Sequence, residues 1–342
     1  MRSSLRTKLG AAIMDWPRFE IGLRNDWTRI RNRQERLEVS PDGLGVACRW
    51  QWTSDLHVAK VFPSLAARLM HRALEDWPIC FADAPSGDAA RVQVSFVIGH
   101  RGMQRAPQLL ATLATIAAQR AIRCECIVVE QSSVAEIRDQ LPHWVRYLHT
   151  PLPAPDMPYC RSWTLNAGAR LAKGRVLVLH DNDMLVPEAY AEQVWRRYEA
   201  GFEVVNLKRF IFYFSEGASK QIQAAHRLKP KAAPTAVVQN AEAGGSLAVE
   251  RDAYFALGGY DESFVGWGGE DNEFWERAQT RRVWPYAYLP IVHLWHSAQA
   301  RKEDRDNPTL RRHAERSSVP PEVRIGELAA RPFGDPANLS VD

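Results

Sequence analysis

Three short apolar runs decide the fold: VQVSFVI at residues 92–98, ECIVVE at residues 125–130 and RVLVL at residues 175–179. Aliphatic and β-branched side chains fill each run, as they do in strands that are buried on both faces. The stretches expected to be helical come between these runs, at Pro107–Gln119, Val134–Gln140 and Arg161–Ala172. Strands that alternate with helices at this spacing predict an α/β fold with a mostly parallel central sheet and helices on both faces.

Polar residues follow each of these strands, at the edge where such sheets bind ligands. The runs continue into His100-Arg101, Glu130-Gln131 and Asp181-Asn182-Asp183. Two carboxylates as close as Asp181 and Asp183 repel each other unless a cation lies between them. A divalent cation bound to a diphosphate would fit, since Mg²⁺ prefers oxygen ligands and shares its shell with phosphates. A polar turn before the helix expected near Pro187 is the alternative.

A second informative segment is GGSLAVERDAYFALGGYDESFVGWGGEDNEFWERA at residues 244–278. The pair Gly244-Gly245 opens a strand, a short helix is expected at Arg251–Leu257, and Gly268-Gly269 precedes Glu270-Asp271 at the start of another helix. Glycines of this kind mark places where a ligand comes close to the main chain. The two carboxylates could also be a favourable charge at a helix N-terminus.

Taken together, these motifs resemble the GT-A glycosyltransferases, family 2-like, with a second half similar to the β-1,4-galactosyltransferases and chondroitin-polymerase-type enzymes. The resemblance covers about Val92 to Pro308. It implies a GT-A (Rossmann-like) fold and a divalent metal, Mn²⁺ or Mg²⁺, on the diphosphate of a nucleotide-sugar. Asp183 would be the direct ligand of that metal, and Asp181 would lie beside the nucleotide.

The same resemblance assigns roles to the Trp-Gly-Gly-Glu-Asp motif at residues 267–271. Asp271 would be the catalytic base, Glu270 would bind the sugar and Trp267 would pack on a sugar. Gly268, Gly269, Gly244 and Gly245 complete the expected substrate site. The residues expected at the nucleotide are Arg101, Glu130 and Arg161.

The segment IVHLWHSAQARKEDRDNP at residues 291–308 carries the last expected elements. In the similar galactosyltransferases a His after a late strand completes the metal site, which makes His296 the matching ligand and His293 a further candidate. The alternative is one satisfied core His and one exposed His. The run Arg301–Asn307 suits a lid that orders over bound donor, or a solvated charged loop.

The reaction that follows from the resemblance is an inverting transfer of a sugar, with UDP the expected nucleotide, to a hydroxyl of a glycan or other acceptor. Three alternatives stay open. One is a retaining transferase of the same fold, because Asn272 follows the motif. Another is a non-catalytic sugar-nucleotide-binding module. A metal hydrolase is the third, although the sequence has no HExxH helix to support it.

The expected organisation has three parts. Residues 1–90 form an N-terminal extension with a helix at Ser64–Trp77, and a linker follows at Ala82–Ala89. Residues 91–308 form the catalytic domain, with a nucleotide-binding half at 91–185 and an acceptor half at 186–308. Residues 309–342, polar and rich in Arg and Pro, are expected to be a partly ordered tail.

Composition sets the remaining limits. A hydrophobic fraction of 46% and a charged fraction of 25% exclude a mostly disordered chain. With 44 basic and 40 acidic residues, the surface is mixed and no nucleic-acid partner is expected. No apolar run reaches the roughly 18 residues of a membrane span. The apolar patch within MRSSLRTKLGAAIMDWP is too brief for the hydrophobic region of a secretory signal, and no clear cleavage site follows it. Five cysteines in no paired framework favour reduced thiols. The expected location is therefore cytoplasmic, with peripheral contact to the inner membrane face left open.

Overall fold

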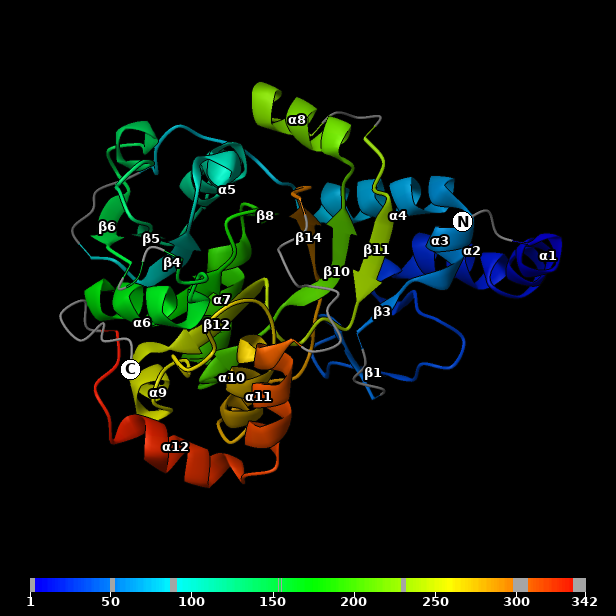
Figure 1. Cartoon of the computed structure of the whole chain (residues 1–342). Coiled ribbons are helices and arrows are strands. Elements are labelled where there is room, and N and C mark those ends of the chain that lie inside the picture. Colours follow the sequence, from blue (N-terminus) through cyan, green and yellow to red (C-terminus); the bar gives the residue numbers. More distant parts are fainter. Residues whose placement is uncertain are drawn as a thin grey trace.

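The computed structural model of the chain describes residues 4–49, 53–86, 91–152, 154, 156–228, 232–297 and 307–334. Its larger sheet, to which the labelled strands β4, β5, β6 and β12 of Figure 1 belong, has seven strands in the order β13-β9-β12-β7-β4-β5-β6. Strands β7, β4, β5 and β6 are parallel, and β12 runs antiparallel to β7 and β9. The bounds are Val94–His100 (β4), Cys124–Gln131 (β5), Arg146–Thr150 (β6), Val176–His180 (β7), Val204–Val205 (β9), Ser246–Glu250 (β12) and Val283–Trp284 (β13).

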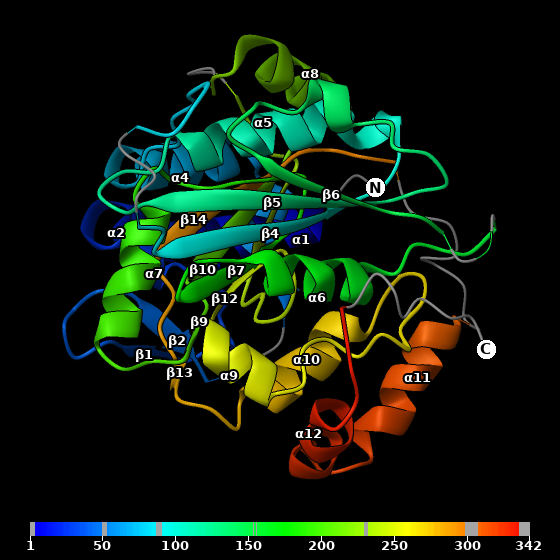
Figure 2. The same cartoon turned by 90° about the vertical axis from the view of Figure 1, so that its left-hand side faces the viewer.

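Helices cover both faces of this sheet, as Figure 2 shows. Val94, Phe96 and Ile98 of β4 pack on one face, and Val97 of the same strand packs on the other. Successive side chains of a strand point to opposite faces, so a run that is apolar throughout can only be a central strand. The predicted α/β class with a mostly parallel sheet is confirmed. The first face carries α5 (Ala106–Ala117) and α7 (Tyr190–Glu199), and the second carries α6 (Arg161–Leu171), α9 (Arg251–Ala256) and α10 (Glu270–Ala278).

A second sheet of five strands has the order β3-β11-β10-β14-β8. Strands β10 and β14 are parallel, and the other pairs are antiparallel. In this sheet His293, the last residue of β14, is the register partner of Met184, the first residue of β8. The pairing therefore places the end of β14 beside Met184, the residue that follows Asp183. The bounds are Ser54–Asp55 (β3), Met184–Leu185 (β8), Lys208–Tyr213 (β10), Ala236–Gln239 (β11) and Leu289–His293 (β14).

The N-terminal region packs onto this second sheet. Leu65 and Leu69 of α4 share an apolar cluster with Phe210 and Phe212 of β10, and β3 pairs with β11. The expected helix at 64–77 is confirmed, but the described part of residues 1–90 shares a core with the rest of the chain. Its elements are α1 (Leu5–Met14), α2 (Trp16–Asn25), a 3₁₀ turn η1 (Trp27–Arg29), β1 (Leu37–Val39), β2 (Val46–Cys48), α3 (His57–Val61) and α4 (Pro63–Asp76).

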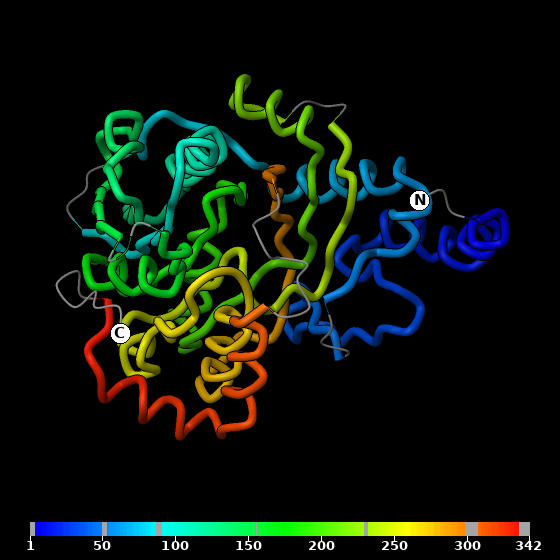
Figure 3. Tube along the Cα trace, in the orientation of Figure 1, coloured from blue at the N-terminus to red at the C-terminus, as the bar shows by residue number. Residues whose placement is uncertain are grey.

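The segment expected to be a partly ordered tail, residues 309–342, contains two helices, α11 (Pro308–Ser317) and α12 (Pro321–Ala329). Both helices lie against α10, as the tube in Figure 3 shows. Their polar sequence did not indicate burial, yet Arg324 is only 1% exposed. It donates to Glu273 and Glu276 of α10 at 3.2 and 2.8 Å. One further helix, α8 (Glu216–Ala225), lies between β10 and β11 in the chain.

The expected helix at Val134–Gln140 is also wrong, since only a 3₁₀ turn at Arg138–Gln140 (η3) forms there. Two backbone N–H groups of this segment donate to a side chain instead of to helical carbonyls. The Glu130 carboxylate accepts the N–H groups of Glu136 and Ile137 at 3.1 and 3.3 Å. None of the helices in the described ranges has the length and apolar content that crossing a bilayer would need.

Candidate active site

A cavity of about 590 Å³ opens where β4 and β7 end and α10 begins. Its size lies within the range of small-molecule binding sites. The predicted site residues that line it are Arg101, Arg161, Asp181, Asp183, Trp267, Glu270, Asp271, His293 and His296. Sequence positions almost 200 residues apart therefore meet in one cavity.

One side of the cavity holds a cluster that suits a metal ion. Ligand atoms of Asp183, His293 and His296 lie within 4.8 Å of one another. The Nε2 atoms of His293 and His296 lie 3.7 and 3.4 Å from the two Asp183 oxygens. One carboxylate and two imidazoles are donors that first-row divalent metals accept.

The two imidazoles are prepared for this role. His296 Nδ1 lies 2.7 Å from the carbonyl oxygen of Ser297 and donates its proton there, which leaves the Nε2 lone pair directed at Asp183. Burial lowers the pKa of His293, so its ring stays neutral and able to bind a metal. The His293 ring also stacks on Tyr213 with centroids 4.3 Å apart, which fixes its plane. These residues fit a divalent cation.

Arg105 is a member of this cluster that sequence reasoning missed. Its Nη1 donates to Asp183 Oδ2 at 2.9 Å, and the Asp183 side chain is 6% exposed. The guanidinium therefore neutralises a nearly buried carboxylate. The signal was present in IGHRGMQR, where Arg105 stands four residues after Arg101, but nothing in the sequence said which of the two reaches Asp183.

The other side of the cavity gathers three carboxylates around Arg161. The guanidinium donates to Asp181 Oδ1 at 2.6 and 2.9 Å and to Asp271 Oδ1 at 2.7 Å. Glu270 Oε1 lies 3.9 Å away. One cation thus faces three acids, so this side of the cavity keeps unbalanced negative charge.

The start of α10 sets the positions of Glu270 and Asp271. Gly269 caps the helix with φ of 88°, a conformation that residues with a side chain rarely adopt. Burial, and next the charge of Asp271, raises the pKa of Glu270 to about 7. Asp271 also accepts a hydrogen bond from the Tyr260 hydroxyl at 2.9 Å. The two neighbouring acids therefore differ. Glu270 has a pKa near neutral pH, whereas Asp271 accepts hydrogen bonds from an arginine and a phenol.

Buried contacts lock α10 in place behind these residues. Arg277 and Glu273 form an ion pair at 2.6 Å with both side chains fully buried. Arg324 of α12 joins the pair from outside the helix. These buried ion pairs tie α12 to α10, so the C-terminal helices help to position the carboxylates.

Several predicted site residues lie elsewhere. Glu130 is fully buried and is not among the residues that line the cavity. Besides the N–H groups of Glu136 and Ile137, just before η3, it accepts from Tyr147 Oη at 2.5 Å. Its place at the nucleotide thus finds no support in its contacts.

The four glycines likewise make room for protein atoms. A Cβ on Gly244 would lie 2.9 Å from Asp271 Oδ2, and one on Gly245 would lie 2.7 Å from Met184 Cε. Cβ atoms on Gly268 and Gly269 would meet Leu310 at 3.3 Å and His313 at 2.8 Å. At Gly268-Gly269, where a ligand was expected close to the main chain, the neighbour is therefore α11. Of the lid expected at 301–307, residues 301–306 lie outside the described residues.

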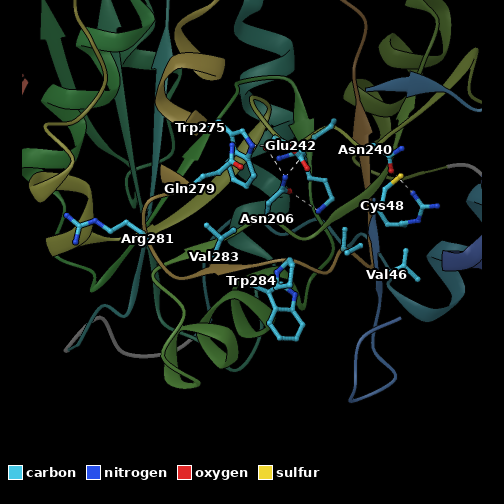
Figure 4. A pocket seen from close by; sticks show the side chains of 16 residues that line it. Val46, Cys48, Asn206, Asn240, Glu242, Trp275, Gln279, Arg281, Val283 and Trp284 are labelled. Atoms are coloured by element: carbon cyan, nitrogen blue, oxygen red, sulfur yellow. Dashed lines mark hydrogen bonds between the residues drawn. The ribbon is translucent and has the colours of Figure 1, made fainter. Parts of the chain in front are cut away.

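Lys208 lies between this site and a second cavity. Its ammonium donates to the Ser246 carbonyl at 2.5 Å, and burial lowers its pKa to about 7 although Asp271 and Asp181 oppose that shift. A lysine in the apolar strand LKRFIFYF was the sequence signal for it. The second cavity, about 360 Å³, is lined by Asn206, Glu242, Trp275 and Trp284 among others (Figure 4).

Comparisons with known families agree with the geometry. A family model described as glycosyl transferase family 2 matches residues 103–246, and one described as the N-terminal domain of galactosyltransferase matches residues 236–288. The first span contains Arg161, Asp181 and Asp183, and the second contains Glu270 and Asp271. Among curated proteins, none matches the chain.

Proposed function

The chain is a family 2-like GT-A glycosyltransferase with a galactosyltransferase-like C-terminal region, and we propose that it transfers a sugar from UDP to a glycan hydroxyl with inversion, using a divalent metal. Sugar transfer, with a nucleotide-sugar donor and a glycan acceptor, follows from the families. The metal, the nucleotide, the stereochemistry and the base are our proposals.

One observation carries the proposal: the Asp183–His293–His296 cluster and Asp271 line the same cavity. A cation held by the cluster would neutralise the charge that develops on the departing diphosphate. Asp271 would meet the acceptor from the other side of the donor sugar. Separate groups for the leaving group and for the incoming hydroxyl are what a single displacement with inversion needs.

The side chains of this cavity divide the work of the reaction. As the acceptor oxygen bonds to the anomeric carbon, its proton passes to a carboxylate oxygen of Asp271, and the bond from that carbon to the phosphate oxygen breaks. The nucleoside diphosphate leaves with the electron pair. Arg161 and Arg105 stand where they can donate to phosphate oxygens. Trp267 would pack on a sugar ring.

A retaining transfer is the second candidate, and Asn272 after the motif is the feature that favours it. Asp271 favours inversion, because a general base has to be accessible to the acceptor. Its carboxylate lines the cavity, and its side chain is 23% exposed. A binding module without turnover would not need an accessible carboxylate across the cavity from the Asp183–His293–His296 cluster.

The test is a panel of UDP-, GDP- and dTDP-sugars with Mn²⁺, with Mg²⁺ and with EDTA, first without and then with glycan acceptors. We expect hydrolysis or transfer from one UDP-sugar that stops with EDTA, and NMR of the product to show an inverted anomeric centre. A retained anomer would overturn the inverting proposal. Full activity in EDTA would overturn the metal site.

A further inference from the structure

Apolar side chains stand in solvent at the N-terminal helices. The described residues include ten large hydrophobic side chains that are exposed, and five of them lie between residues 5 and 21. Leu5, Leu9 and Ile13 are 75%, 54% and 68% exposed, and their four-residue spacing places them along one side of α1. Met14 at the end of α1 and Ile21 on α2 are also exposed, at 46% and 61%. This group is called the apolar face below.

The same region holds the positive charge of the chain. Between Ser4 and Arg36 there are eight basic and four acidic residues, an excess of four, and the formal net charge of the whole chain is also +4. Arg6, Lys8 and Arg18 are exposed and form no ion pair with any other described residue. The remainder of the chain is therefore close to neutral, and its excess charge surrounds the apolar face.

A groove beside the apolar face is lined with arginines. It measures about 820 Å³, and Arg18, Arg29, Arg31, Arg33 and Arg36 line it together with Ile21 and Ile30. Arg29 and Arg33 pair with Asp26 and Asp15, whereas the Arg31 side chain donates to backbone carbonyls. The groove thus offers more guanidinium groups than carboxylates, which suits anionic head groups.

We propose that α1 and α2 dock the protein onto an anionic lipid bilayer. Apolar side chains enter the boundary of the acyl chains while surrounding cations meet lipid phosphates, and neither signal alone gives stable attachment. An acidic protein partner would satisfy the cations and leave the apolar side chains in water. Figure 1 shows α1 at the right-hand end of the molecule, far from α9 and α12. This inference does not depend on the proposed function.

The experiment is co-sedimentation of the full chain with vesicles of phosphatidylcholine alone or mixed with phosphatidylglycerol. We expect binding to the mixed vesicles, little to the neutral ones, and a decline with added salt. The double variant Leu5→Ser/Ile13→Ser should bind mixed vesicles about tenfold or more weakly, since two large side chains no longer enter the bilayer. The triple variant Arg6→Gln/Lys8→Gln/Arg18→Gln should show a similar loss.

The matched control removes exposed apolar side chains elsewhere. Val134 and Val323 are 65% and 50% exposed, and Val134→Ser/Val323→Ser should bind vesicles like the native chain. Circular dichroism checks that every variant is folded. Absence of native binding to mixed vesicles overturns the proposal, as does equal loss in the control. So does an oligomer in size-exclusion chromatography that Leu5→Ser/Ile13→Ser dissolves while vesicle binding persists, because the face would then serve a second copy of the chain.

Discussion

Two cavities adjoin α10, and their lining groups differ in how far they are already paired. In the cavity at Asp183 and Asp271, three carboxylates share Arg161, and the Nε2 atoms of His293 and His296 face the Asp183 oxygens at 3.7 and 3.4 Å. In the cavity of Figure 4, Glu242 accepts from the Trp275 indole at 3.0 Å, and Asn206 donates to the backbone carbonyls of residues 241 and 242. The second cavity is lined by one acid, Glu242, and by the cations Lys208, Arg209 and Arg281, so only the first cavity offers the carboxylates and imidazoles that a metal and a general base need.

The largest effect should follow from Asp271→Asn. A positioned general base contributes about 10²- to 10⁴-fold, so we expect kcat to fall by that factor while donor binding, measured by calorimetry, changes little. Asp252→Asn is the matched control, because Asp252 is an exposed acid on α9. Equal turnover in the two variants would remove Asp271 from the chemistry.

Loss of one imidazole should come next. His296→Ala removes a proposed ligand, and we expect Mn²⁺ affinity to weaken about 10- to 100-fold, the loss typical even of supporting residues around a metal. Calorimetry or EPR of the protein with Mn²⁺ alone measures it without substrate. His143→Ala, at an exposed position, serves as control. Unchanged affinity in His296→Ala would mean that the three side chains do not form a metal site.

Lys208, between the cavities, should give a pH effect of known sign. Its folded pKa of about 7 lies below the roughly 10.4 of an unfolded lysine, so between these values the unfolded state binds more protons. The free energy of unfolding of the native chain should therefore rise with pH over that window relative to Lys208→Met, by at most about 1.4 kcal/mol per pH unit. Urea unfolding of both proteins from pH 7 to 10 measures the difference. Parallel curves would show that the ammonium is not desolvated.

The smallest effect is expected in the second cavity. Trp275→Phe removes the hydrogen bond to Glu242 and should lower the free energy of unfolding by about 1 kcal/mol, with kcat and KM for the acceptor within about twofold of the native values. Thermal unfolding and transfer kinetics test the two parts. A KM for the acceptor raised well beyond that range would show that this cavity is part of the acceptor site. The two cavities would then not differ in function.

The sequence determined the sheet and the identity of the acids. Strands β4, β5 and β7 start and end within two residues of the predicted runs, because side chains buried on both faces leave an apolar run that no other element explains. Asp181, Asp183, Glu270 and Asp271 were also visible, since each stands directly after a strand or at the first turn of a helix, and all four line one cavity.

Tertiary structure alone decided which groups touch them. Nothing local distinguishes Arg105, which reaches Asp183, from Arg101, which donates to the Met157 carbonyl. The sequence also could not show that α11 is the neighbour of Gly268 and Gly269. Nor does the polar segment after Pro308 indicate that Arg324 is buried against Glu273. Periodicity records which side of an element is buried. The partner of a charge depends on contacts between distant segments, and those exist only once the chain has packed.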